Sequence, residues 1–111
     1  MRFYGIPSEE RLEEIIESVK DGEWVLEDVK EKRREELSGE EVRKRLREIA
    51  DQIKRWKEEF STLTKTAVFA FVHEPEDPKA FKIYDPSSLG CSTELTPPRW
   101  KVYTKDLEDK V

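Results

Sequence analysis

The sequence has 111 residues and a formal net charge of -5, with 42% charged and 35% hydrophobic residues. Because a single core is usually built from about 50 to 200 residues, this length excludes a large multidomain enzyme. With three Trp, three Tyr and five Phe, the chain is also too aromatic for an intrinsically disordered protein. We therefore expect residues 1–111 to form one domain.

The residue types also indicate the environment of the protein. There is no Asn and Gln52 is the only Gln, whereas Glu, Lys and Arg are abundant, as in thermophilic proteins. Cys91 is the only Cys, so no intramolecular disulfide can form, which favours a reducing compartment. No apolar run approaches the roughly 20 residues that span a bilayer. We expect a cytoplasmic protein with no membrane partner.

The first half of the chain predicts helices. Pro7 and Ser8 precede an apolar pattern of helical period that stops at Asp21-Gly22, which predicts a first helix over about 9–20. A second apolar stretch from Trp24 to Val29 runs into the charged segment 30–36, where a second helix is allowed. Ser38-Gly39-Glu40-Glu41 is a capping-box pattern, and the stripe that follows predicts a third helix over about 39–60.

After Ser61 the apolar period changes from 3.6 to 2, which predicts strands. Residues 67–73 and 80–84 read as a hairpin around the Pro-containing turn 74–79, and 99–103 as a third strand. Residues 86–98 look irregular, and 104–111 form a terminal tail with a helical turn at most. The expected fold class is α+β, with three helices followed by a small antiparallel β-sheet.

The segments IIESVKDGEWVLEDV and LSGEEVRKRLREI, followed by the hairpin, resemble the winged helix-turn-helix family of prokaryotic and archaeal regulators over about residues 9–85. The resemblance implies that the Ser-capped helix, with Val42, Leu46 and Ile49, is a recognition helix and that the hairpin 67–84 is the wing. It implies a sequence-specific transcriptional regulator that binds double-stranded DNA. Because the wing loop is acidic, we expect it to pack or dimerise rather than contact phosphate.

The residues themselves also point to a nucleic-acid surface. Residues 30–65 hold twelve basic and nine acidic side chains, the only part of the chain with net positive charge. On a helical wheel, basic side chains form a row beside the apolar stripe of the third helix, and two more precede its cap. The candidate DNA-binding residues are Arg43, Lys44, Arg47, Lys54, Arg33 and Arg34. Glutamates interleave with these cations, so a purely solvated, salt-bridged face is an equally open interpretation.

The predicted strands carry apolar residues on both faces. One face would cover the helices, and the other would form a surface for a homodimer or another protein partner, with interface residues Phe69, Phe71, Phe81, Ile83 and Trp100. Alternatively, the N-terminal RFYGI or residues 86–98 fold over it. Exposed aromatics that stack single-stranded bases are a further option, which the few basic residues on these strands disfavour.

The second function that stays open is therefore an acidic adaptor or inhibitor that binds protein and no nucleic acid. Catalysis is not expected, because His73, Cys91 and Asp85 form no recognisable nucleophile motif. The four glycines are scattered and form no phosphate-binding loop, and no residues show metal-ligand spacing, so we expect neither cofactor nor metal.

Overall fold

The computed structural model describes residues 1–59, 68–86 and 97–111. They form a six-stranded sheet in which every neighbouring pair of strands is antiparallel. The spatial order of the strands is β1-β4-β5-β6-β2-β3. Their bounds are β1 (Tyr4–Ile6), β2 (Glu23–Asp28), β3 (Arg33–Ser38), β4 (Ala70–His73), β5 (Ala80–Ile83) and β6 (Trp100–Thr104).

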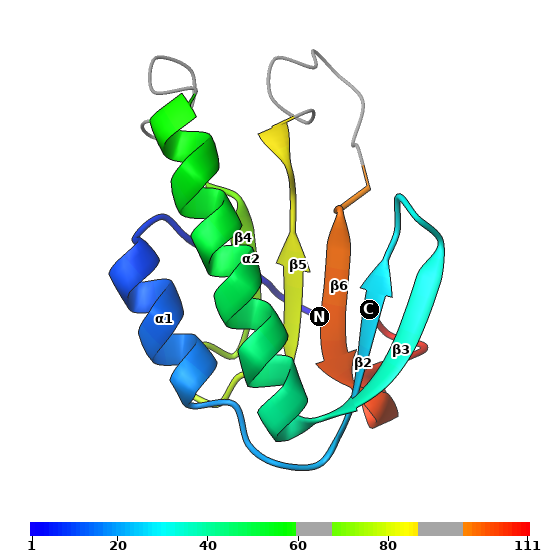
Figure 1. The fold of residues 1–111 in the computed structure, drawn as a ribbon. Coiled ribbons are helices and arrows are strands. Elements are labelled where there is room, and N and C mark those ends of the chain that lie inside the picture. The colour runs from blue at the N-terminus through cyan, green and yellow to red at the C-terminus, as the bar shows by residue number, and fades with distance from the viewer. Residues whose placement is uncertain (60–67, 87–96) are drawn as a thin grey trace.

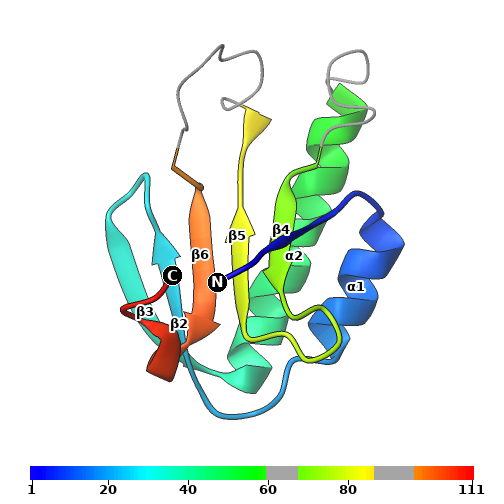
Figure 2. The same ribbon diagram turned by 180° about the vertical axis from the view of Figure 1, so that it is seen from behind.

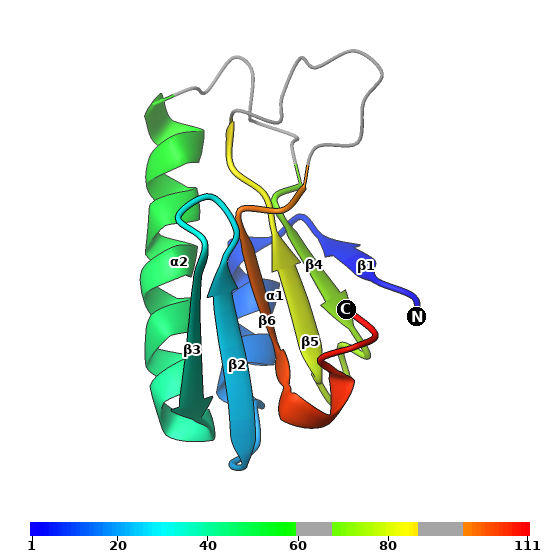
Figure 3. The same ribbon diagram turned by 90° about the vertical axis from the view of Figure 1, so that its right-hand side faces the viewer.

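Two helices, α1 (Glu9–Glu17) and α2 (Gly39–Glu59), pack on one face of this sheet (Figures 1 and 3). Among the described residues no α-helix lies on the other face, and both chain termini lie on it (Figures 2 and 3). The predicted order of three helices followed by a small sheet is therefore wrong, because strands precede, separate and follow the two helices. Neither described helix is long and apolar enough to cross a membrane.

Both well-patterned helices are confirmed, and their first turns are capped as expected. In α1, the Ser8 side chain accepts a hydrogen bond from the Arg11 amide at 3.3 Å. In α2, the Glu41 amide donates to Ser38 Oγ at 3.2 Å and the Ser38 amide donates to Glu41 Oε1 at 3.3 Å. This is the reciprocal pairing that the capping-box sequence predicts. Residue 60, the last of the predicted third helix, lies outside the described residues.

The helix allowed between residues 24 and 36 is absent, and the hairpin β2–β3 takes its place. Trp24, Val25 and Leu26 are all buried because β2 lies between β6 and β3 and both of its faces are covered. At the turn, Lys32 adopts a positive φ of 56° and Asp28 Oδ1 accepts the Glu31 amide at 3.1 Å. Without this second helix, residues 1–59 contain no helix-turn-helix unit, so the winged-helix fold that the resemblance implied is also wrong.

The strands of the second half are confirmed, with the hairpin β4–β5 and the strand β6 where the sequence predicts them. The tail begins with a short 3-10 turn, η2 (Lys105–Leu107). The sequence did not predict β1, which extends the sheet by pairing Tyr4–Ile6 with β4. Most of the predicted irregular segment 86–98 lies outside the described residues.

Most of the apolar surface predicted as an interface is instead interior. Phe69, Phe81 and Ile83 are 2%, 0% and 1% exposed and pack in the core between the sheet and the helices. Trp100 is partly buried and stacks on Trp56 of α2, with ring centroids 6.0 Å apart. Of the five residues, Phe71 alone points to the sheet face without helices, so this set of residues does not form the surface on which a homodimer was expected.

Candidate functional site

The cationic row of α2 lies against α1 rather than facing solvent alone. Four basic side chains of α2 contact acidic groups that recur every four residues along α1 and the turn after it. From one end to the other, the pairs are Lys57 with Glu9 (2.6 Å), Lys54 with Glu13, Arg47 with Glu17 (2.7 Å) and Arg43 with Asp21 (3.3 Å). We call this set the α1–α2 ladder. It fixes the antiparallel packing of the two helices.

The ladder changes the ionisation of its members in the directions expected for ion pairs. Hydrogen bonds from Arg47 hold the pKa of the Glu17 carboxyl below its ordinary value, and the same contact raises the pKa of Arg47. Partial burial opposes ionisation of Glu9, but the hydrogen bond from Lys57 keeps the pKa of Glu9 lowered. The lowered pKa values keep the Glu9 and Glu17 carboxyls ionised at neutral pH.

Most of the cations predicted to contact DNA consequently have internal partners. Arg43 also donates to the backbone carbonyl of Val19, which ties α2 to the end of α1. Arg34 pairs with Glu36 and Glu108. Lys44 and Arg33 are exposed and have no ion pair among the described residues. The predicted row therefore has a structural role that the sequence pattern alone did not reveal.

Figure 2 shows the sheet from the face that α1 and α2 do not cover, and the strand register places a row of residues across this face. Strand register places one residue of each strand side by side, because paired residues of adjacent strands share a face. In spatial order the row is Gly5, Phe71, Lys82, Lys101, Glu27 and Arg34. We call it the open-face row. It contains two basic residues directly opposite each other on β5 and β6, and a third on β3.

The Lys82 and Lys101 pair is unusual for a sheet, because like charges directly opposite each other are destabilising. The ammonium of Lys82 lies 4.5 Å from the ring centroid of Phe3, a cation–π contact that leaves its charge uncancelled. Lys101 is also opposite Glu27 but forms no ion pair within 4.0 Å among the described residues. Neither Lys82 nor Lys101 forms an ion pair with another described residue, so the two form a site of positive charge that this part of the chain does not compensate.

Aromatic side chains flank these lysines. Phe71 and Tyr84 meet edge to face with ring centroids 5.6 Å apart, and both are half-buried. His73 lies 5.8 Å from Phe3, and its Nδ1 donates to the carbonyl oxygen of Arg2 at 2.7 Å. These contacts hold the N-terminal segment across the face, as one of the sequence alternatives anticipated, and leave Phe71 and Tyr84 beside Lys82.

The other end of the open-face row is hollowed. A depression of about 330 Å³ is lined by four basic residues, two acidic residues and Val29. The basic residues are Lys32, Arg33, Arg34 and Lys101, and the acidic ones are Glu27 and Asp28. Two of the six cations predicted to bind nucleic acid, Arg33 and Arg34, thus lie at this depression rather than beside the recognition helix that was expected.

C-terminal residues cover the part of this face next to the open-face row, around Val25, Ala80 and Tyr103. Val25, Ala80 and Tyr103 form a small buried cluster there, against which Phe3, Leu107 and Val111 pack. Burial, together with the nearby carboxylates of Glu27 and Glu108, raises the pKa of the Tyr103 hydroxyl to about 12. The accessible part of the face is therefore the open-face row and its aromatic neighbours.

Of the three residues considered for catalysis, the two that the structure describes, His73 and Asp85, contact other groups. Asp85 lies 3.9 Å from Arg99, His73 is engaged with Arg2, and Cys91 lies outside the described residues. The described residues contain no group of three or more His, Cys, Asp or Glu side chains that could hold a metal ion.

Comparison with known proteins identifies one relative. A protein of Aquifex aeolicus (strain VF5), described as an uncharacterized protein, is 54% identical over 108 residues. The match covers 97% of this chain and 88% of the relative. The chain belongs to the family of that protein. No protein-family model matches the sequence, and no solved structure matches it.

Sequence reasoning missed Lys82, Lys101 and Tyr84 as members of a site. The alternating pattern of β5 does place Lys82 opposite to Phe81 and Ile83, which are buried against the helices. That signal was available in the sequence. The position of Lys101 beside it depends on the pairing of β5 with β6, which no local pattern specifies.

Proposed function

We propose that this protein binds single-stranded nucleic acid on the sheet face away from the helices. The observation that carries the proposal is the opposed pair Lys82 and Lys101 beside the aromatic pair Phe71 and Tyr84. Phosphate groups of a nucleic acid can neutralise the two adjacent lysines, which have no carboxylate partner among the described residues. Aromatic rings stack on bases of any sequence. These are the two components that single-strand binding surfaces combine.

The dimensions of the face favour a single strand over a duplex. Neighbouring strands lie about 4.8 Å apart, so the five strands from β4 to β3 span roughly 19 Å, enough for a short run of nucleotides. The major groove of a duplex is about 12 Å wide and admits a helix or a two-stranded ribbon, not a wide sheet. The helix predicted from sequence to bind in the groove has three of its four candidate cations, Arg43, Arg47 and Lys54, in the α1–α2 ladder.

Fluorescence anisotropy of labelled single-stranded RNA and DNA 12-mers, with a duplex of matched sequence, tests the proposal. We expect micromolar binding of the single strands at low salt, weaker binding of the duplex, and a steep loss of affinity as salt is raised. The double variant Lys82→Ala/Lys101→Ala should lower affinity for the single strand at least tenfold. Lys44→Ala, an exposed lysine on α2, is the matched control and should bind as wild type.

A second substitution separates stacking from general charge attraction. Phe71→Ala should weaken single-strand binding by about 1–3 kcal/mol, the usual contribution of one stacked base, without changing the dependence on salt. If neither oligonucleotide binds at low salt, or if the lysine double variant binds as tightly as wild type, the proposal is wrong.

A protein-binding role remains a second candidate because of one groove. Between α1 and α2 lies a depression of about 730 Å³ whose lining carries five carboxylates and a single arginine: Glu10, Glu13, Glu14, Glu17, Asp51 and Arg47. Such a surface would suit a basic segment of a partner protein. The test is binding of a lysine-rich peptide. This candidate would be favoured if the peptide bound the wild-type protein but not the Glu10→Lys/Glu14→Lys variant, and if the wild-type protein bound no oligonucleotide.

A further inference from the structure

The helix side of the sheet carries a second depression, beside α2 and away from α1. It has a volume of about 520 Å³, within the roughly 300–1,000 Å³ usual for small-molecule sites. It is lined from α2 by Arg45, Glu48, Ile49, Gln52, Arg55 and Trp56, and from the start of β6 by Arg99 and Trp100. We call it the arginine groove. It lies on the opposite side of the sheet from the open-face row.

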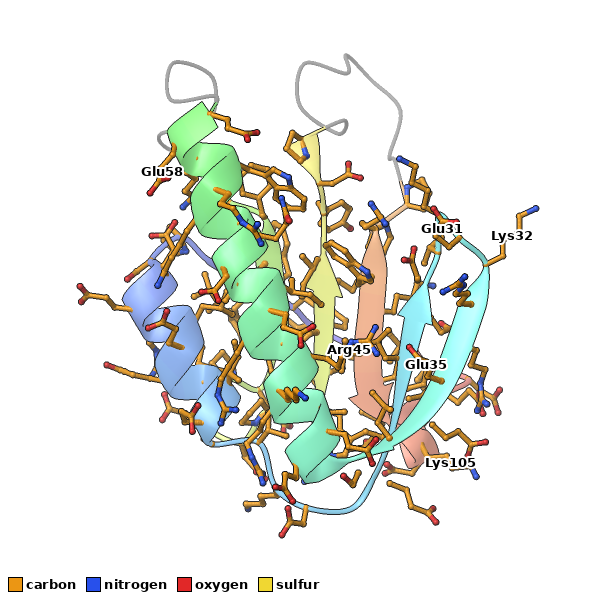
Figure 4. The ribbon with its side chains drawn as sticks, viewed as in Figure 1. Glu31, Lys32, Glu35, Arg45, Glu58 and Lys105 are labelled. Carbon is orange, nitrogen blue, oxygen red and sulfur yellow. The ribbon has the colours of Figure 1, made fainter. Side chains whose placement is uncertain are left out.

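Three guanidinium groups and one carboxylate line the arginine groove, so its lining has a positive excess. Arg55 is exposed and has no ion pair or side-chain hydrogen bond among the described residues. Arg45 pairs with Glu35 of β3 at 3.1 Å, and Figure 4 shows these two side chains facing each other across the gap between α2 and β3. Because both side chains are about two-fifths exposed, this ion pair is weak and can be exchanged for a ligand.

Arg99 has a different role, because it is already neutralised. Its guanidinium donates to Asp28 at 3.1 Å and lies 3.9 Å from Asp85. Burial opposes ionisation of Asp28, but hydrogen bonds from Arg99 keep the pKa of this carboxyl below its ordinary value. The same guanidinium lies 4.7 Å from the centroid of Trp100. Arg99 thus fixes the wall of the groove rather than supplying free charge.

The wall that Arg99 supports is aromatic. Trp100 stacks on Trp56 with an interplanar angle of 16°, and Phe69 packs against Trp56 from the core. Arg45 and Arg55 are ten residues apart on α2, about 15 Å along its axis, so the two free or exchangeable guanidinium groups lie toward opposite ends of the groove. Gln52 lies between them and can both donate and accept hydrogen bonds.

We propose that the arginine groove binds a small organic polyphosphate. Arg45 and Arg55 contact its negatively charged groups, and its organic part lies against the tryptophan wall. Elongated ligands of this kind match the spacing of the two arginines, and guanidinium groups bind phosphate with the forked geometry that favours Arg over Lys. This site is independent of the open-face row, since the two have no lining residue in common.

Intrinsic tryptophan fluorescence gives a direct test, because Trp56 and Trp100 line the groove whereas Trp24 is buried under α2. ATP is the probe, titrated against the wild-type protein with inorganic tripolyphosphate as the comparison. We expect a saturable change with ATP that weakens as salt is raised, and at least fivefold weaker binding of tripolyphosphate, which has no organic part to lie on the tryptophans.

Variants locate the site. Arg55→Ala and Arg45→Ala should each lower ATP affinity at least fivefold, whereas Lys44→Ala, exposed on the same helix, should leave it unchanged. Glu35→Gln should raise the affinity, because it removes the carboxylate that competes for Arg45. Lys82→Ala/Lys101→Ala should not change ATP binding, which separates this site from the proposed nucleic-acid surface. No saturable change at millimolar ATP, equal affinity for tripolyphosphate, or wild-type affinity in either arginine variant would overturn the proposal.

Discussion

Two rows of cations lie on this protein, and they differ in what surrounds them. In the α1–α2 ladder each basic side chain of α2 meets an acidic group of α1 or of the turn after it. In the open-face row Lys82 and Lys101 lie opposite each other, and Lys101 has no ion pair among the described residues. The ladder is thus internally neutralised, whereas the two lysines of the open-face row have no ion pair among the described residues. Uncompensated charge, rather than the number of charges, indicates where a polyanion would bind.

The largest expected difference between the two faces of the sheet is in the stability effect of substituting two adjacent residues of β5, Phe81 and Lys82. Phe81 is fully buried against the helices, so Phe81→Ala should lower the free energy of unfolding by about 3–5 kcal/mol. Lys82 points to the open face, so Lys82→Ala should leave stability nearly unchanged and weaken binding of single-stranded nucleic acid. Urea denaturation followed by tryptophan fluorescence measures the first effect. Similar destabilisation by both substitutions would contradict the assignment of faces.

The helices were predictable from sequence because their signals are local. Ser38 and Glu41 sit three residues apart and cap α2 as their spacing implies. The segment from Trp24 to Asp28 was ambiguous, because a strand buried on both faces shows no alternation. Strand β1 has three residues, too few for a pattern, and it is held by pairing with β4. The fold class was wrong because these two segments depend on partners distant in sequence.

In the candidate site too, features set by a local pattern were predictable, and features that depend on distant partners were not. Alternation along residues 67–73 predicts that Phe69, Phe71 and His73 share one face. Phe71 and His73 do share the face without α-helices, but Phe69 packs in the core against Trp56 of α2, so that part of the prediction is wrong. The partners of Arg43 and Arg47 lie 22 and 30 residues away along the chain, so a helical wheel of α2 could not reveal them. The same holds for Lys82 and Lys101, which are brought together only by the pairing of β5 and β6.

Within the α1–α2 ladder, a substitution should destabilise the protein more when the substituted side chain is more buried. The Arg43 side chain is 22% exposed and donates to the carbonyl of Val19, so Arg43→Ala should lower the free energy of unfolding by about 1.5–3 kcal/mol. Arg47 and Glu17 are both more than half exposed, so Arg47→Ala should have a much smaller effect. Neither should change oligonucleotide affinity in anisotropy measurements. Loss of binding with intact folding in both variants would restore α2 as the nucleic-acid surface.

Burial of Tyr103 under the C-terminal residues should be detectable in the pH dependence of the free energy of unfolding. The pKa of Tyr103 is raised to about 12, so the folded state keeps a proton that the unfolded state loses near pH 10. The resulting stabilisation is complete below pH 10 and is lost as the pH rises from 10 to 12. Urea denaturation across this range should therefore show a decline that is shallower in Tyr103→Phe. An identical decline in wild type and variant would show that the hydroxyl is not buried in this cluster.

Substitution of Lys101 should change stability least, although this residue has a clear expected effect on binding of single-stranded nucleic acid. Lys101→Gln removes both the repulsion from Lys82 and the attraction to Glu27, so the free energy of unfolding should stay within about 0.5 kcal/mol of wild type. A lysine that contacts one phosphate of a single strand contributes about 0.7 to the slope of log affinity against log salt concentration. Lys101→Gln should reduce that slope by this amount, whereas Lys44→Gln should not. A lower affinity with an unchanged slope would mean that Lys101 acts on the shape of the face and not on phosphate.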